Sequence, residues 1–299
     1  MSLGMSLGGT KVLIAGCGDL GTRLGLELAR GGAEVYGLRR QAHKLPSPLR
    51  GLSADLAAPR GLDDLPATDL VVYALAADGY NDEAYRKAYV DGVRHLLQAL
   101  EGRPPRRWLH VSSTSVYGQQ NGEWVDEDSV TEPAAFSGRR LLEGEQILRQ
   151  SPVGSVVLRL SGIYGPGRTR LLESVRRGTA VCSQPPVYTN RIHSLDAVAA
   201  LHHLAGLERP APLYLGVDHE PALDGDVKRW LAEQLGAPVP AMAEPASEGA
   251  TRAASGTPRR SRRSHKRCSN RLLLEHGFRF KYPDFRAGYS ELIDQLRGS

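Results

Sequence analysis

The sequence feature that most constrains the fold is the glycine-rich segment 16–21, which reads Gly-Cys-Gly-Asp-Leu-Gly. It follows the apolar run 11–15 and precedes a leucine at every fourth position, at Leu20, Leu24 and Leu28. A short apolar run ending in glycine is typical of a buried parallel strand, and the leucine spacing gives a helix one apolar stripe. The pattern therefore predicts a strand, a tight turn and a helix, the arrangement that binds a dinucleotide.

Each glycine of this turn has its own predicted role. Gly16 permits the tight turn, Gly18 lets the backbone approach a pyrophosphate, and Gly21 lets helix and strand pack closely. Asp19 and Leu20 open the helix, where free backbone N–H groups favour an anion. We therefore expect these five residues to contact the cofactor.

The end of the second predicted strand, 34–38, indicates which dinucleotide binds. Sites for NAD usually carry an acidic residue there, whereas this chain has Arg39 and Arg40. An arginine favours the 2′-phosphate of NADP. We expect NADP in preference to NAD, with a solvated arginine pair as the alternative. Asp55 and its neighbour Leu56 are candidates for the adenine edge, although Asp55 could simply cap the next turn.

Strand-like and helical segments alternate through the first half of the chain. Further strands are expected at 70–75, 108–112 and 156–160, and a helix from about 82 to 100. This alternation predicts an α/β fold, a Rossmann-type doubly wound parallel sheet with a smaller carboxyl-terminal substrate domain. Ligands bind such sheets at the carboxyl ends of the strands. The second half is less regular, with a strand expected at 213–217, a helix at 227–235 and a loop at 237–265.

These patterns divide the chain into three parts. We expect a dinucleotide-binding domain at 10–165 and a smaller substrate domain at 166–299. A strand and a helix near 190–218 can return to the first sheet. Residues 1–9 repeat themselves and are interpreted as an added or disordered leader.

Charge and cysteine usage narrow the choice of partners and location. The net charge is +5, but segment 252–271 alone holds eight Lys or Arg residues and no acid. No aromatic residue is interleaved there to stack on bases, so nucleic acid is disfavoured as a partner. A solvated loop is the favoured interpretation. Substrate phosphate binding by Lys266 or Arg267 is the alternative. The three cysteines fit no zinc or disulfide framework, which favours the cytoplasm and predicts no metal site. No apolar run is long enough to span a membrane, so no membrane partner is expected.

Five stretches together resemble the extended or atypical short-chain dehydrogenases/reductases of the NAD(P)-dependent epimerase/dehydratase type. They are the glycine turn and segments 74–77, 111–118, 158–167 and 190–196, which spread over most of residues 11–200. The resemblance implies a Rossmann domain, a smaller substrate domain and a small-molecule substrate, which in many members is a nucleotide sugar. It also implies a homodimer as a further expectation.

The resemblance implies roles for individual residues. Ser113 or Thr114 would hydrogen-bond the reacting hydroxyl or carbonyl, and Tyr164 would lie on the nicotinamide side. Arg191 and His193 would lie near the substrate cleft, with His193 a candidate base, and Asp196 would cap a helix that starts at residue 197. The cofactor contacts that it adds are Ala74, Leu75, Ala76 and Ile163.

The chain departs from this family at its central motif, Tyr-x-x-x-Lys. The best register places Phe136 at the tyrosine position and Arg140 at the lysine position. Phenylalanine has no proton to exchange, whereas arginine stays charged and could still hold the cofactor ribose. Four alternatives follow. Another residue could supply the proton, or the chain could be a non-catalytic NADP-binding sensor or regulator. The register could differ, or the reaction could proceed without such an acid. The candidate proton donors are Tyr80, Tyr117, Tyr164 and His193.

Overall fold

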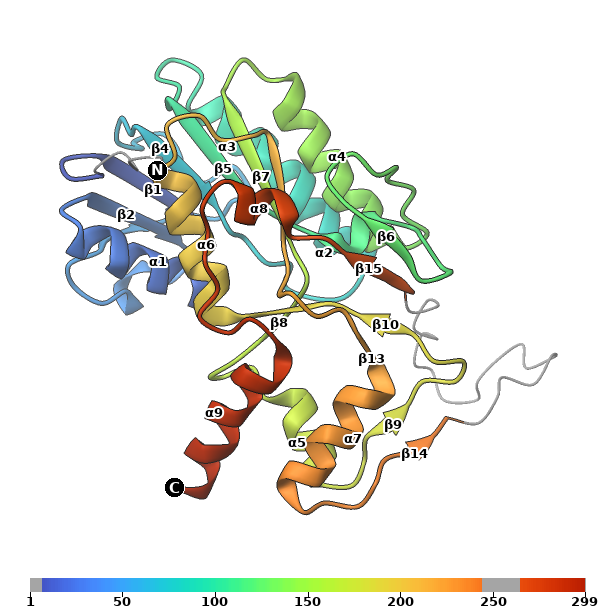
Figure 1. Ribbon diagram of the computed structural model, residues 1–299. Coiled ribbons are helices and arrows are strands. Elements are labelled where there is room, and N and C mark those ends of the chain that lie inside the picture. Colours follow the sequence, from blue (N-terminus) through green and yellow to red (C-terminus); the bar gives the residue numbers. More distant parts are fainter. Residues whose placement is uncertain (1–6, 244–263, 299) are drawn as a thin grey trace.

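The computed structural model describes residues 7–243 and 264–298. Its centre is a 7-stranded parallel sheet with the strand order β12-β7-β5-β4-β1-β2-β3 (Figure 1). This confirms the predicted Rossmann-type fold. The order reverses between β1 and β4, and such a reversal is where ligands bind in open α/β sheets. The sheet strands are β1 Lys11–Ala15, β2 Glu34–Arg39, β3 Arg50–Ser53, β4 Leu70–Tyr73, β5 Arg107–Ser113, β7 Ser155–Leu160 and β12 Leu213–Gly216.

Helices cover both faces of the sheet because successive strand side chains point to opposite sides. Val12 and Ile14 pack with helices α1 and α6 on one face, whereas Leu13 and Ala15 pack with α3 and α4 on the other. The predicted leucine stripe of α1 is buried as expected. The helices are α1 Asp19–Arg30, α2 Asp82–Arg86, α3 Gly92–Ala99, α4 Phe136–Gln150, α5 Arg170–Arg176, α6 Ser194–Gly206, α7 Asp224–Leu235, α8 Arg271–Glu275 and α9 Phe285–Arg297.

The helix expected from about 82 to 100 is not continuous. A π-helical stretch, Lys87–Asp91, separates α2 from α3. The buried phenol of Tyr73 donates to the carbonyl of Ala88 inside this stretch. Such wide turns often accompany functional sites, and this one faces the carboxyl ends of β1 and β4.

The second half of the chain contributes to both parts of the molecule. Strand β12 joins the main sheet beside β7, and α6 packs on α1, so parts of segment 190–218 contact the sheet and the helix beside it. A smaller lobe gathers α5, α7 and α9 around a separate apolar core (Figure 1). Short strand pairs connect distant segments: β8 Gly162–Tyr164 with β11 Arg191–His193, β6 Glu123–Val125 with β15 Lys266–Cys268, β9 Val181–Cys182 with β14 Ala241–Met242, and β10 Tyr188–Thr189 with β13 Ala222–Leu223.

Two boundaries differ from those expected. Leu7 is buried in the main core and Gly9 N donates to Gly32 O at 2.9 Å, so residues 7–9 are part of the fold although they belong to the segment interpreted as a leader. Helix α7 starts at Asp224 instead of residue 227, because Asp224 and Asp226 place carboxylates in its first turn. The expected loop at 237–265 contains the short strand β14, and its residues 244–263 lie outside the described residues.

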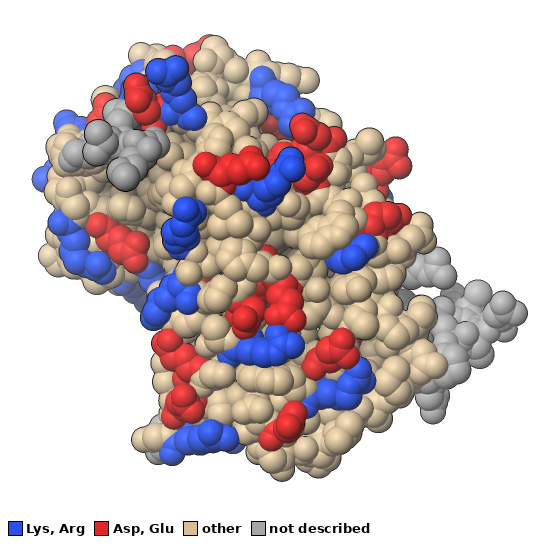
Figure 2. Space-filling model, viewed as in Figure 1, with Lys and Arg blue, Asp and Glu red and all other residues tan. Residues whose placement is uncertain are grey.

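On the face shown in Figure 2, Lys and Arg lie among Asp and Glu and do not form one basic patch. None of the described helices is long and apolar enough to cross a membrane. All three cysteines are buried and free. Within the described ranges, no cluster of His, Cys, Asp or Glu is arranged to hold a metal ion.

Candidate functional site

A cavity of about 1220 Å³ lies at the carboxyl ends of the strands where their order reverses. Every cofactor contact predicted from the sequence lines it, except Arg140. These residues are Gly16, Gly18, Asp19, Leu20, Gly21, Arg39, Arg40, Asp55, Leu56, Ala74, Leu75, Ala76 and Ile163. The volume exceeds the ~300–1,000 Å³ of usual ligand pockets, which suits an extended ligand.

The glycine turn has the geometry that a bound pyrophosphate requires. Gly16 has a φ of +79°, and a Cβ there would collide with the backbone of Leu75. A Cβ on Gly21 would lie 2.9 Å from Ile14 Cγ2, so this glycine lets α1 pack on β1. A Cβ on Gly18 would lie 3.9 Å from the carbonyl oxygen of Gly16, so space is open beside its backbone. The open cradle at the start of α1 therefore fits a dinucleotide phosphate.

The two arginines after β2 differ in their partners. Arg39 Nη1 donates to the carbonyl of Cys17 at 3.3 Å, and no carboxylate of the described residues pairs with Arg39. Arg40 donates twice to Asp78, at 2.8 and 2.6 Å. Asp55 accepts from Ala57 N at 3.0 Å, so it closes a turn and also lines the cavity. Arg39 is therefore the arginine with charge available for a ligand phosphate.

A second cavity, of about 930 Å³, adjoins the first. Seven residues line both cavities; five of them carry hydroxyl groups, and Ser113 and Ser161 lie at the carboxyl ends of β5 and β7. They are Tyr80, Ser113, Ser115, Ser137, Ser161, Ile163 and Arg168. Thr114 lines the second cavity, beside the thiol of Cys268. A ligand in the first cavity and one in the second would therefore meet over Ser113.

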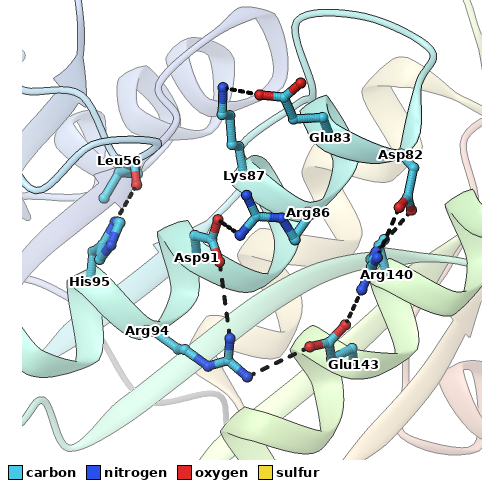
Figure 3. A network of polar contacts seen from close by, with 10 residues as sticks. All are labelled: Leu56, Asp82, Glu83, Arg86, Lys87, Asp91, Arg94, His95, Arg140 and Glu143. Atoms are coloured by element: carbon cyan, nitrogen blue, oxygen red, sulfur yellow. Dashed lines mark hydrogen bonds and ion pairs between the residues drawn. The ribbon is translucent and has the colours of Figure 1, made fainter.

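Helix α4 presents different residues to the cavities from those expected. Neither Phe136 nor Arg140 is among the described side chains that line either cavity, whereas Ser137 and Leu141 line the first. Arg140 is held away by Asp82, at 2.9 and 2.8 Å, and by Glu143, at 2.9 Å (Figure 3). The register that placed Phe136 and Arg140 at the Tyr-x-x-x-Lys positions is thus wrong by one residue.

The corrected positions also lack the family's acid and cation. Ser137 and Leu141 have the same spacing of four residues, so they share one face of α4. A leucine has no charge to hold a ribose, and an isolated serine is not a phenol whose pKa a lysine lowers. Phe136 instead packs its ring 5.0 Å from that of Tyr80 and 5.4 Å from that of Tyr85.

The candidate proton donors differ in access. Tyr117 is buried, with its phenol between Arg159 Nη1, at 2.7 Å, and Asp126 O, at 2.7 Å. Tyr164 lines the second cavity, but burial raises the pKa of its phenol well above the usual value. Tyr80 is 62% exposed and lines both cavities. Among these tyrosines, Tyr80 alone reaches the junction.

His193 and Asp196 have structural roles at the start of α6. His193 Nδ1 accepts from Leu195 N at 3.4 Å, and burial lowers the pKa of His193 to about 4. His193 is not among the described residues that line either cavity, so the structure does not place it at the expected position near the cleft. Asp196 does not cap α6; its carboxylate accepts from Lys281 N at 2.8 Å and Tyr282 N at 2.9 Å. It thereby fastens the carboxyl-terminal segment to the helix.

The expected resemblance is supported by comparisons with known proteins. The profile of the NAD dependent epimerase/dehydratase family matches residues 12–205. The chain belongs to this family. It is 37% identical over 171 residues to protein YeeZ of Escherichia coli K12, an alignment that covers 53% of this chain and 60% of YeeZ. The dTDP-6-deoxy-L-talose 4-dehydrogenase (NAD(P)(+)) of Kitasatospora kifunensis is 30% identical over 266 residues, which cover 79% of this chain and 82% of that protein.

A solved structure from Methylobacillus flagellatus, assigned to the NAD-dependent epimerases/dehydratases, superposes with a TM-score of 0.78. It is 37% identical and the match covers 96% of this chain and 99% of that one. Family membership makes this an NAD(P)-binding Rossmann protein. It leaves the choice between NADP and NAD, and the substrate, to the residues of the site.

Ser137 and Arg168 are site residues that the sequence reasoning missed. A signal for Ser137 was present, because Leu141 and Leu148 mark the inward face of α4 and counting back four from Leu141 reaches position 137. No comparable signal marks Arg168, which lies in the turn after β8 and donates to Asp19 at 3.1 Å. Its position depends on how the smaller lobe meets the sheet.

Proposed function

We propose that this protein binds NADP in the first cavity and oxidises, reduces, epimerises or dehydrates a small polar substrate in the second. The observation that carries the proposal is that the two cavities meet over the hydroxyl groups at the ends of β5 and β7. A sensor or regulator needs only the dinucleotide cavity. A second cavity that opens onto the same floor favours an enzyme.

The preference for NADP rests on Arg39. Arg39 lines the first cavity, and no carboxylate of the described residues compensates its charge. A phosphate on the adenine ribose would supply that missing charge. Arg40 contributes less, because Asp78 already pairs with it.

Tyr80 is the proposed proton donor. The bound dinucleotide would supply or accept the hydride, so the protein has to bring the substrate oxygen to a proton and hold it there. Ser113 would hydrogen-bond that oxygen, and the Tyr80 phenol would give it a proton during reduction or take one during oxidation. The dTDP-sugar in the name of the Kitasatospora relative supports a nucleotide sugar as one candidate substrate.

Turnover of NADPH with a panel of carbonyl compounds, followed by absorbance, tests the proposal. Tyr80→Phe should lower kcat by about 10²–10⁴-fold, the usual contribution of a positioned acid, and leave NADPH affinity unchanged. Tyr36→Phe is the matched control, because Tyr36 lines neither cavity. Tight NADPH binding without turnover of any compound would favour the sensor instead.

A further inference from the structure

The second cavity contains a buried lysine, Lys266, that is paired with no carboxylate of the described residues. Lys266, on β15, is 3% exposed and lines the cavity. Its ammonium donates to the carbonyl of Tyr117 at 3.1 Å and to the hydroxyl of Ser264. Across residues 7–243 and 264–298, no carboxylate lies within ion-pair distance of it. Both of its hydrogen-bond partners are uncharged.

A lone buried ammonium is energetically unfavourable. Burial accordingly lowers the pKa of Lys266. A buried lysine is usually paired with a carboxylate. Lys228, which also lines this cavity and is similarly buried, has its ammonium 2.6 Å from the carboxylate of Asp224. Lys266 therefore has the character of a cation whose partner is a ligand.

Arg191 supplies a second, independent donor in this cavity. It is 6% exposed, its Nη2 donates to the hydroxyl of Thr189, and its Nη1 is buried without a partner. Asp218 forms no ion pair with it; burial raises the pKa of Asp218 to about 8, although the charge of Arg191 acts to lower that pKa. The carboxyl of Asp218 is therefore a weak counter-charge at neutral pH.

The fold brings these two cations to one cavity from segments far apart in the sequence. Strand β15 pairs with β6 (Figure 1), and Asn190 fastens it to β11. The amide of Asn190 donates to Lys266 O at 3.0 Å, and its oxygen accepts from Cys268 N at 2.7 Å. Arg267 points elsewhere, with its guanidinium 5.1 Å from the ring centres of both Trp124 and Tyr188.

We infer that the second cavity binds substrates that carry an anionic group, a carboxylate or a phosphate, with Lys266 Nζ and Arg191 Nη1 as its donors. The inference rests on the proposed function, because it takes the second cavity as the substrate site. It narrows the small polar substrate to an anionic one. Arg168 and Arg170 add positive charge to the same wall.

The test titrates full-length protein, saturated with NADPH, with inorganic phosphate, malonate or neutral glycerol at constant ionic strength, by calorimetry. Phosphate or malonate, or both, should bind saturably, and glycerol should not. Binding of phosphate would identify the anionic group of the substrate as a phosphate, and binding of malonate would identify it as a carboxylate. Lys266→Met and Arg191→Met should each weaken that binding at least tenfold. Lys44→Met removes an exposed lysine outside both cavities and should leave it unchanged.

Thermal unfolding keeps the test decisive. In chloride buffer, Lys266→Met should unfold at the wild-type temperature or higher, because it removes a lone buried charge. A clear fall in that temperature, or equal anion binding by wild type and Lys266→Met, would overturn the inference. NADPH binding separates the two proposals. If the wild-type protein does not bind NADPH, the proposed function is refuted. Anion binding that depends on Lys266 would still support the anionic substrate site.

Discussion

Replacing Arg39 with alanine should separate NADPH from NADH. Arg39 ends β2, and its hydrogen bond to Cys17 O, at 3.3 Å, holds the guanidinium at the rim of the first cavity. Arg40 is paired with Asp78 by two hydrogen bonds, so its charge is already compensated. If the 2′-phosphate binds here, Arg39 makes the contact and Arg40 adds little.

The expected loss follows from the kind of contact. A hydrogen bond to a charged group contributes about 1.5–3 kcal/mol. Arg39 is only half-buried, so solvent screening favours the lower part of that range. A loss of about 1.5–2 kcal/mol corresponds to roughly 10- to 30-fold weaker NADPH binding. NADH has no 2′-phosphate, so its affinity should change little.

Fluorescence titration of NADPH and NADH against wild type, Arg39→Ala and Arg40→Ala measures these affinities. Arg40→Ala is the matched control and should have the smaller effect on NADPH. Equal losses for both cofactors in Arg39→Ala would refute the phosphate contact. A larger loss in Arg40→Ala would refute the argument that Asp78 neutralises its partner.

Three further predictions follow from particular contacts. Gly18→Ala should change the free energy of unfolding by less than about 0.5 kcal/mol, yet weaken dinucleotide binding at least tenfold because the new Cβ fills the open cradle. Gly16→Ala should lower the free energy of unfolding by more than about 1 kcal/mol. Thermal unfolding and cofactor titration of both variants measure these two effects. Glu145→Ala should cost about 3–5 kcal/mol in denaturant unfolding, because it removes the carboxylate 2.6 Å from the buried Arg159 guanidinium and leaves that charge with the neutral phenol of Tyr117. A loss under about 1 kcal/mol would contradict this. Burial lowers the pKa of His110 to about 4, against about 6.5 when unfolded, so the unfolded state binds the extra proton. Neutral His110 therefore contributes up to about 3 kcal/mol to the free energy of unfolding above pH ~6.5, and this contribution is lost as the pH falls toward 4. In His110→Leu the free energy of unfolding should fall less over that pH window. Parallel curves of unfolding free energy against pH for variant and wild type would disprove the assignment.

The cofactor half of the site could be predicted from the sequence because its signals are local. The turn at 16–21 lies between its own strand and helix, and Arg39 ends the next strand, so short-range patterns locate both. Parallel strands bring their carboxyl ends to one edge, which then gathers residues 74–76 and 113 without further information.

The substrate half could not be predicted in the same way because its contacts are long-range. Lys266 reaches the cavity only because β15 pairs with β6, more than a hundred residues earlier in the chain. Arg168 depends on the position of the smaller lobe. A basic run in the sequence cannot distinguish the buried Lys266 from the adjacent Arg267, which stacks outside between aromatic rings.

The error at α4 bears most directly on function. A one-residue shift rotates a helix position by about 100°, which is enough to turn a side chain from the cavity to the surface. Phe136 therefore does not replace a catalytic tyrosine; it supports Tyr80 by packing against its ring. The position that faces the cofactor cavity carries Ser137 instead. The proton donor that we propose therefore comes from outside α4: Tyr80 lies on the loop before α2 and lines both cavities.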